Sequence, residues 1–576
     1  MIKTLSVLLA TCSIGLCSPV DARTPYFQMA KATQDEVPKA HNKNSVQTRS
    51  DIKELKAGNY LASRFAQTRH DWKSASIFMD PILQTGIWHK EITQQAMIIA
   101  MGAGEVKKAL TLAKQVKDLN PNKNNTIAST FLLVKEFKNK NYKQAKKILE
   151  SMDNDATMRF IGPYVTGWVD AALGKANIDG LKKNTMQLYH AILISDFLND
   201  HEDVGKVINI AMKVDQITPS EIERIADLYS HIGMEENAIE LYERILKKHP
   251  EDEAIKIKIK NIKDGTNKAL FQKIKTPQEG MAKAFYDISR ILYNENNDDS
   301  ARVFVHISLY LSPDTSETKF LLGGINARHK QYDQAIDLYK SIPKDDKDYL
   351  QAQYNIVDIY DDTEQIDKAL SILNRLAKGE KKPAVLIKIG DLYRHREQYQ
   401  KALDMYNRAA KEIDGEITKD YWTLHYVRGI AYEQLKQWDK AEKELKAALK
   451  LQPNHPYVLN YLGYSWVDRN INLDKATKMI QKAVNARPND GYITDSLGWA
   501  MYRNADYRGA VGVLERAVEL LPYDPTINDH FGDALWRVGR KLEAKYQWNR
   551  AVNNSKDEKQ IKEIQEKISS GILKEI

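Results

Sequence analysis

The chain has 576 residues, of which 28% are charged and 43% hydrophobic, and its formal net charge is +8 at pH 7. Lysines and acids are interspersed, as in KAEKELKAALK at 440–450, and no basic run alternates with stacking aromatics. The charge therefore predicts solvated helix faces and excludes a nucleic-acid surface. Both cysteines, Cys12 and Cys17, lie near the start of the chain, so the remainder has neither a disulfide framework nor a thiolate metal site.

Residues 1–22 are predicted to be a secretory signal peptide. Lys3 precedes an apolar run from Leu5 to Cys17, and Ala22 closes a Val-Asp-Ala sequence with small residues where a signal peptidase reads. The run is too short to span a membrane. A lipoprotein signal is the alternative, since Leu9-Ala10-Thr11-Cys12 resembles a lipobox, but Thr11 before the cysteine fits poorly. Cleavage to a soluble product is favoured over lipidation. A cleaved secretory signal predicts that the protein is located in the periplasm of a Gram-negative bacterium.

The mature chain is organised by helical repeats. A disordered leader is expected first because it is polar and lacks helical periodicity, and the segment 251–280 is expected to be irregular because it is Lys-rich and broken by Gly265, Pro277 and Gly280. The predicted order is a leader at 23–56, degenerate N-terminal helical repeats at 57–215, one repeat at 216–250, an irregular boundary at 251–280, a regular array at 281–556 and a capping helix at 557–576.

A fixed period runs through the regular array. The recurring alanines, mostly 33 to 35 residues apart, are Ala301, Ala335, Ala369, Ala402, Ala441, Ala476, Ala510 and Ala544. A glycine stands 12 or 13 residues before the last three, and an aromatic often stands three residues before the alanine, as in Tyr507/Ala510. Small residues at fixed positions let two antiparallel helices approach closely. A helix pair of this kind cannot bury its apolar face alone, so the units are expected to stack.

The spacing of Leu497-Gly498, Ala510, Leu514, Ala517 and Pro522 resembles the tetratricopeptide repeat. The resemblance implies an all-α fold, a tetratricopeptide-repeat (TPR) solenoid in which antiparallel helix pairs form a right-handed superhelix. The charged amphipathic segment at 557–576 fits the cap that a solenoid needs over its last apolar surface.

No catalytic motif is present in the sequence. It contains no P-loop, dinucleotide-binding turn, HExxH, GxSxG or EF-hand loop, and its 13 histidines are scattered without the spacing of metal ligands. We therefore expect a protein that is not an enzyme, with no catalytic residue, no cofactor and no bound metal.

Partner binding is expected on the first helix of each repeat. Tyr492, Asp495, Trp499 and Tyr502 follow a spacing that places them together on one helix face, and in the resembled family the first helices line the concave surface. Aromatic and arginine side chains dominate binding hot spots. The predicted groove residues are Tyr457, Asn460, Tyr464, Tyr492, Asp495, Trp499, Tyr502, Arg503, Asp529, Asp533, Trp536 and Arg537. For Trp499 and Trp536 the alternative, that they fill the joint between stacked repeats, remains equally open.

Three acids in this set predict the charge of the ligand. Chaperone-binding repeats of the resembled family hold a terminal carboxylate with Lys and Asn, which the corresponding positions here do not supply. Asp495, Asp529 and Asp533 are instead expected to attract a basic segment, so changing all three to Asn should weaken binding of the partner.

The block from Asn460 to Ala551 resembles large periplasmic and outer-membrane TPR proteins of proteobacteria. That group includes the adaptor of a carboxyl-terminal processing protease. The resemblance implies a periplasmic scaffold that binds protein partners, namely a protease and its substrates. The alternative is a cell-envelope assembly factor acting at the outer-membrane surface through its net positive charge. Surface association with a membrane is compatible with this sequence, whereas an integral span is not.

Overall fold

The computed structural model describes residues 57–84, 89–119, 125–200, 219–249, 252–266, 274–379, 382–413, 415, 417–418 and 421–571. Within these ranges the regular secondary structure is helical throughout, with no strand, which confirms the predicted all-α class. The predicted signal peptide (1–22) and leader (23–56) lie outside the described residues. None of the described helices is both long and apolar enough to span a membrane.

Packing divides the chain into two compact units, and the division falls between Ile359 and Tyr360. We call the described residues before the division the N-terminal unit and those after it the C-terminal unit. The helix α19 (Tyr349–Asp362) contains the dividing point. The division lies about eighty residues beyond the boundary expected at 251–280, which contains a regular helix, α14 (Glu253–Lys263).

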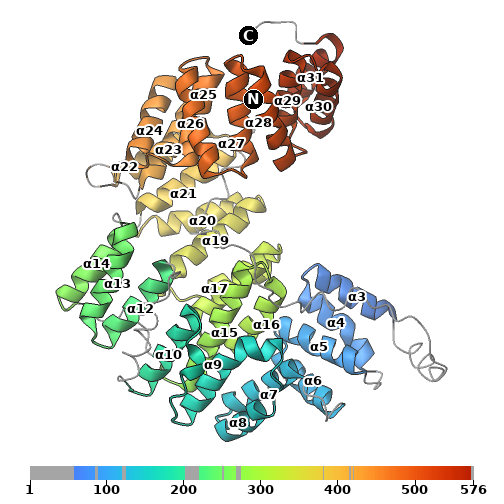
Figure 1. The fold of residues 1–576 in the computed structure, drawn as a ribbon, viewed down its shortest axis with the longest axis vertical. Coiled ribbons are helices and arrows are strands. Elements are labelled where there is room, and N and C mark those ends of the chain that lie inside the picture. The colour runs from blue at the N-terminus through green and yellow to red at the C-terminus, as the bar shows by residue number, and fades with distance from the viewer. Residues whose placement is uncertain are drawn as a thin grey trace. The chain divides into compact units, whose positions relative to one another are not determined.

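The C-terminal unit is a regular stack of antiparallel helix pairs, drawn from yellow to red in Figure 1. Each pair is followed directly by the next, and the last helix packs on the final pair. Its helices are α20 (Ile366–Leu376), α21 (Lys382–His395), α22 (Tyr399–Lys411), α23 (Trp422–Gln434), α24 (Trp438–Leu451), α25 (Pro456–Asp468), α26 (Leu473–Ala486), α27 (Gly491–Arg503), α28 (Tyr507–Leu520), α29 (Pro525–Arg537), α30 (Lys541–Asn554) and α31 (Glu558–Ser570).

The N-terminal unit is also built from helix pairs, with one short 3-10 helix (η2). Its helices before α19 are α3 (Ala57–Thr68), α4 (Trp72–Leu83), α5 (Lys90–Gly102), α6 (Val106–Asp118), α7 (Thr126–Lys138), α8 (Tyr142–Glu150), α9 (Ala156–Ala172), η2 (Asp179–Leu181), α10 (Thr185–Phe197), α12 (Pro219–His231), α13 (Glu235–Lys248), α14 (Glu253–Lys263), α15 (Pro277–Asn294), α16 (Asp298–Leu311), α17 (Ser316–Arg328) and α18 (Tyr332–Lys340).

The recurring small residues do what their spacing predicts. Ala476, Ala510 and Ala544 are fully buried on the second helices of their pairs. On the first helices, a Cβ added at Gly498 would lie 2.5 Å from Leu514 Cγ, and one added at Gly532 would lie 2.4 Å from Trp548 Cδ1. The two helices of a pair therefore approach more closely than any larger residue at these positions would allow.

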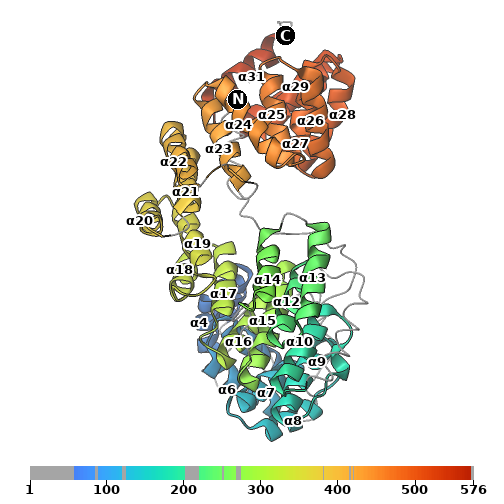
Figure 2. The same cartoon turned by 90° about the vertical axis from the view of Figure 1, so that its left-hand side faces the viewer.

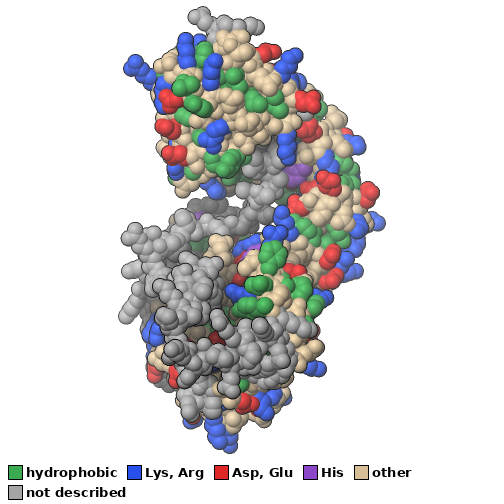
Figure 3. All heavy atoms as spheres, turned by 90° about the vertical axis from the view of Figure 1, so that its right-hand side faces the viewer, with side chains coloured by type: hydrophobic (Ala, Val, Ile, Leu, Met, Phe, Trp, Pro, Cys, Tyr) green, Lys and Arg blue, Asp and Glu red, His purple; other side chains and the backbone are tan. Residues whose placement is uncertain are grey.

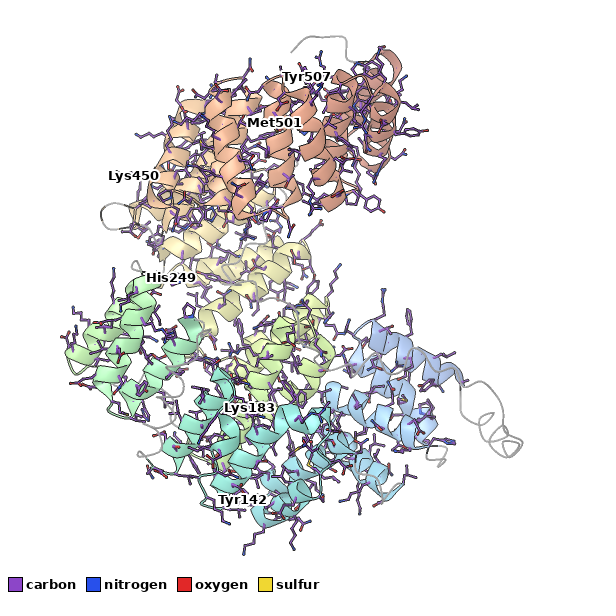
Figure 4. The ribbon with its side chains drawn as sticks, in the orientation of Figure 1. Tyr142, Lys183, His249, Lys450, Met501 and Tyr507 are labelled. Carbon is purple, nitrogen blue, oxygen red and sulfur yellow. The ribbon has the colours of Figure 1, made fainter. Side chains whose placement is uncertain are left out.

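The aromatic that precedes the recurring alanine opens the second helix of its pair. Tyr399, Trp438 and Tyr507 are the first residues of α22, α24 and α28. Two residues before each aromatic, the turn contains a residue with a left-handed backbone, such as Ala505 with φ 61°. Figure 4 shows Tyr507 and Met501 close to the turn that joins α27 to α28.

The N-terminal unit departs from a simple linear stack because α15 and α16 pack back on earlier helices. α15 contacts α9 and α10, whereas α16 contacts α5 and α7. Figure 2 shows α15 next to α10 and α16 next to α7. Arg302 Nε of α16 donates to the Gly102 carbonyl at 2.8 Å, and Gln278 Nε2 of α15 donates to the Phe137 carbonyl at 3.1 Å. One continuous hydrophobic core consequently extends from Ala66 to Ile325.

Charged side chains of both signs are interspersed on the described surface in the view of Figure 3. No broad patch of one sign is visible on the described part of that face. This distribution agrees with solvated helix faces, as the alternation of lysines and acids in the sequence predicts.

Candidate partner-binding face

The residues predicted to bind a partner lie on three neighbouring first helices, α25, α27 and α29, which contact one another in order. We call this set of side chains the first-helix face. The buried members are Asn460, Tyr464, Asp495, Trp499, Tyr502, Asp529 and Asp533. The half-buried members are Tyr457, Tyr492, Arg503, Trp536 and Arg537. The structure thus brings the predicted residues together, while their role in binding stays a prediction.

Asp495 of α27 is paired with His530 of α29. His530 Nδ1 lies 3.0 Å from Asp495 Oδ1 and 3.1 Å from Oδ2, and only 1% of His530 is exposed. Burial disfavours the charged imidazole, but Asp495, together with Asp529 and Asp533, outweighs burial and raises the pKa of His530 above its ordinary value. His530 of the next repeat therefore pairs with Asp495, one of the three acids that were expected to attract a basic ligand.

Trp499 lies in the joint between α27 and α29. Its ring stacks on Tyr502, with centroids 4.8 Å apart, and on His530, with centroids 4.1 Å apart. Trp499 is 7% exposed, so the structure places it in the inter-repeat packing, as the alternative interpretation of this residue expected. Nearly parallel rings at these distances stabilise the joint beyond the apolar area that they bury.

Trp536 has a second tryptophan as its neighbour. Its ring centroid lies 5.4 Å from that of Trp548 on α30, and a Cβ added at Gly571 would lie 2.2 Å from Trp536 Cζ2. Trp536 therefore packs against both α30 and the end of α31. It remains half-buried, unlike Trp499.

Asp529 and Asp533 are bridged by Lys567 of the last helix, α31. Lys567 Nζ lies 2.7 Å from Asp529 Oδ1 and 2.8 Å from Asp533 Oδ2. Trp548 Nε1 also donates to Asp533 Oδ1 at 2.9 Å. Burial and the neighbouring Asp529 raise the pKa of Asp533 to about 6, although Lys567 acts in the opposite direction. The expected attraction of a basic group to this acid pair is thus present, and the chain itself supplies the group.

Several buried polar atoms on α25, α27 and α29 have no hydrogen-bond partner among the described residues. Among them are Asn460 Oδ1 and Arg503 Nε of the first-helix face, and Nε2 of the neighbouring His530. A buried polar group without a partner is costly and uncommon in native structures. Because these atoms are shielded from solvent, a ligand would have to displace neighbouring side chains to form hydrogen bonds with them.

The remaining tyrosines and arginines of the face contact other side chains. Arg537 Nε donates to the Tyr502 hydroxyl at 3.2 Å, and the Arg487 guanidinium lies 5.6 Å from the ring centroid of Tyr457. Burial, followed by Asp524, raises the pKa of Tyr492 to about 12. Burial, followed by Asp495, also raises the pKa of Tyr464.

Two residues that pair with the predicted acids, His530 and Lys567, were not predicted from the sequence. His530 stands one repeat and one residue after Asp495, so the repeat period itself could have indicated the contact. No sequence pattern indicated the contact of Lys567 with Asp529 and Asp533, because α31 lies outside the repeat and its angle to α29 depends on packing. Among the described residues, no group of three or more His, Cys, Asp or Glu side chains is arranged to hold a metal ion.

Three segments match sequence profiles of the tetratricopeptide repeat. The matched residues are 223–252, 327–390 and 422–455. The chain thus contains tetratricopeptide repeats, and its described part is an all-α solenoid of that type. The resemblance to a protease adaptor is not confirmed by these matches. No curated protein sequence matches the chain significantly.

The similar solved structures given below are distant from this chain. MamA from Desulfovibrio magneticus RS-1 is 20% identical, with a TM-score of 0.27, and the match covers 30% of this chain and 95% of that one. The APC/C hetero-tetramer Cut9-Hcn1 is 13% identical over 86% of this chain and 93% of that one, with a TM-score of 0.38. Yeast Tom70 is 14% identical over 91% and 96%, with a TM-score of 0.29. At these values the similarities carry no information on function.

Proposed function

We propose that this chain is a non-enzymatic periplasmic scaffold whose first-helix face holds partner proteins, and that one partner is a processing protease to which the scaffold presents substrates. Tetratricopeptide repeats support a protein-binding scaffold, because stacked helix pairs offer a long surface for many weak contacts. The periplasmic location and the protease rest on the signal-like segment at 1–22 and on the resemblance of the C-terminal block.

The observation that favours the first-helix face as the binding surface is its set of unpartnered buried groups. Asn460, Arg503 and His530 each present an atom without a hydrogen-bond partner within the described structure. They lie on three successive first helices, α25, α27 and α29. An extended or helical segment that crosses these helices would pass all three groups, and repeat arrays bind their ligands through such contacts on successive repeats.

Affinity capture tests this proposal. The mature chain, beginning at Arg23, is crosslinked in an envelope extract, and the retained proteins are identified by mass spectrometry. We expect a processing protease together with cell-wall hydrolases. The double variant Asn460→Leu/Arg503→Leu should lose at least about tenfold of that recovery, since it removes two of the unpartnered groups. The control Asn454→Ala/Arg508→Ala changes the same residue types at exposed positions and should retain it.

The alternative, an envelope factor at the outer-membrane surface, is favoured by the formal charge of +8. In that case the chain should bind anionic vesicles, and binding should disappear at moderate salt because exposed charges are screened over about 8 Å at physiological ionic strength. Capture of outer-membrane assembly components without a protease, together with such vesicle binding, would contradict the adaptor proposal.

A further inference from the structure

The last helix, α31, is attached to the C-terminal unit by few groups. Ile564 is its one fully buried helical side chain, and Ile561, Lys567 and Ile568 are half-buried on the same face. Outside that apolar contact, Gln560 Nε2 forms a weak hydrogen bond to Thr526 Oγ1, at 3.3 Å, Gln560 Oε1 accepts from Ser555 Oγ at 2.7 Å, Gly571 packs against Trp536, and Lys567 bonds Asp529 and Asp533. By comparison, the preceding helix α30 buries Ala544, Trp548 and Ala551 completely.

A cap that only covers apolar surface would not need an ion pair at its centre. The surface beneath α31 nevertheless presents two carboxylates one helical turn apart, Asp529 and Asp533, whose side chains are 3% and 8% exposed. Like charges at this spacing repel one another, and the repulsion grows when water is excluded. Lys567 supplies one positive charge to two acids, so this part of the surface favours a cation.

The neighbouring His530 is coupled electrostatically to the same acid pair. His530 is 1% exposed and lies in the electrostatic field of both Asp529 and Asp533. Its Nδ1 is satisfied by Asp495, whereas its Nε2 has no partner among the described residues even with α31 in place.

We propose that Asp529, Asp533, His530 and the apolar seat of Ile564 form a binding site for an amphipathic helix of a partner protein, and that α31 occupies this site within the chain. The partner helix would present an aliphatic residue and, three residues later, a lysine, as Ile564 and Lys567 do. The inference rests on the proposed scaffold function and specifies the chemistry of one partner segment. α31 then acts as an internal competitor that a better ligand displaces.

The connection between α30 and α31 determines how strongly α31 competes. Only Ser555, Lys556 and Asp557 separate the two helices. A tether this short gives α31 a high effective concentration at the site, of the order of millimolar. A partner must therefore bind the empty site much more tightly than α31 does, or be held to the scaffold by contacts elsewhere on the first-helix face.

A peptide competition experiment tests the inference. The probe is a fluorescent synthetic peptide with the sequence of residues 557–571. In the full chain, Ile564→Asp and Lys567→Gln weaken the internal helix, and this released chain is compared with the wild type. We expect the probe to bind the released chain at least about tenfold more tightly, because the tethered competitor is gone. A control chain carrying the exposed change Lys559→Gln should behave like the wild type.

Two further arms test the chemistry. A probe with Gln in place of Lys567 should bind the released chain at least about tenfold more weakly. The unmodified probe should likewise bind more weakly to a released chain that also carries Asp529→Asn and Asp533→Asn. Equal binding to all chains, or binding that does not depend on the lysine, would overturn the inference. Because no natural partner is used, such a failure leaves the scaffold function to be judged by the capture experiment alone.

Amide hydrogen exchange of the wild-type chain tests whether α31 detaches, and it does not require the released chain to fold. We expect the amides of α31 to exchange much faster than those of α29, and faster still at high salt, because an ion pair whose lysine is 23% exposed contributes to its attachment. Equal protection of the two helices would refute a displaceable α31. Concentration-dependent dimers of the wild type that disappear in the released chain would identify the occupant as a second copy, which also contradicts a heterologous partner.

Discussion

His530 and Asp495 form an ion pair across the joint between two successive repeats, with Nδ1 3.0 Å from Oδ1 and both side chains almost completely buried. The pair links α29 to α27 at the centre of the first-helix face, beside the stacked ring of Trp499. A charge at this depth is stable only while its partner is present. The packing of these two repeats therefore depends on the protonation of His530.

Replacement of Asp495 should lower the pKa of His530. In Asp495→Asn, burial still disfavours the imidazolium, and the largest opposing carboxylate has been removed. The His530 contribution to stability is present below the ordinary histidine pKa and is lost as pH rises through the raised value, so the variant should lose stability mainly on the acidic side of that window. NMR titration of labelled histidine measures the change. The exposed substitution Asp439→Asn serves as the control, and an unchanged His530 titration would disprove the pairing.

In the N-terminal unit, Asp287 should be essential for stability. It is fully buried, with Arg224 Nη1 at 3.3 Å, Lys283 Nζ at 3.6 Å and Arg290 Nε at 3.8 Å. Although burial favours the neutral acid, the surrounding cations lower its pKa below the usual range. Asp287→Asn would leave these cations without their shared partner, which should cost about 3 kcal/mol of unfolding free energy.

Urea titrations followed by circular dichroism test this expectation. The same substitution at Asp179, whose side chain is 90% exposed and paired only with Lys182, gives the matched control in the same unit. No measurable loss is expected there, because surface ion pairs contribute little. A loss at Asp287 no larger than at Asp179 would contradict the role assigned to the buried carboxylate.

The fold of the C-terminal unit could be predicted because its signals are local and repeated. Gly498, Ala510 and the aromatic Tyr507 each act within one helix pair, at a spacing that recurs every repeat. The placement of the first-helix residues on α25, α27 and α29 followed from the same period. Helical periodicity alone, however, does not distinguish a residue that lines the groove from one that packs between repeats. The position of Trp499 could be assigned only once the angle between successive repeats was known.

The N-terminal unit was predicted less well for a physical reason. The return of α15 and α16 onto α5, α7 and α9 depends on contacts between residues far apart in sequence, such as Arg302 with Gly102 and Gly280 with Trp168. Gly280 had been interpreted as a chain breaker, whereas it lies in α15 and leaves room for the Trp168 ring. A glycine can serve either purpose, and only the identity of its neighbour distinguishes them.

Acidification should destabilise the N-terminal unit through His190. This residue is completely buried; its Nδ1 accepts a hydrogen bond from Trp168 Nε1 at 3.2 Å, and its Nε2 lies 3.4 Å from Asp287. Burial lowers the pKa of His190 below its ordinary value of 6.5, although Asp287 opposes this effect, and Lys283 and Arg224 reinforce it. His190 is therefore protonated less readily in the folded state than in the unfolded state.

The direction of this pH dependence follows from the linkage between proton binding and folding. Stability from a histidine with a depressed folded pKa is present above pH 6.5 and is lost as pH falls below it, at a slope of at most about 1.4 kcal/mol per pH unit. His190→Gln should reduce this slope, whereas His249→Gln, at an exposed position, should not. Urea titrations between about pH 5 and 7 compare the three chains. Identical slopes in all of them would exclude His190 as the source.

Two glycines in the pair α27–α28 should respond in opposite directions to the same substitution. Gly498 lies on α27, where an added Cβ would be 2.5 Å from Leu514 Cγ, so Gly498→Ala should cost about 1–3 kcal/mol by overpacking. Gly512 lies within α28, where an added Cβ would meet nothing within 4 Å, and Gly512→Ala should stabilise the pair by about 0.5–1 kcal/mol because alanine loses less conformational freedom in a helix. Urea unfolding of both variants gives the comparison. If Gly498→Ala were neutral or stabilising, the close approach that defines the repeat would not depend on this glycine.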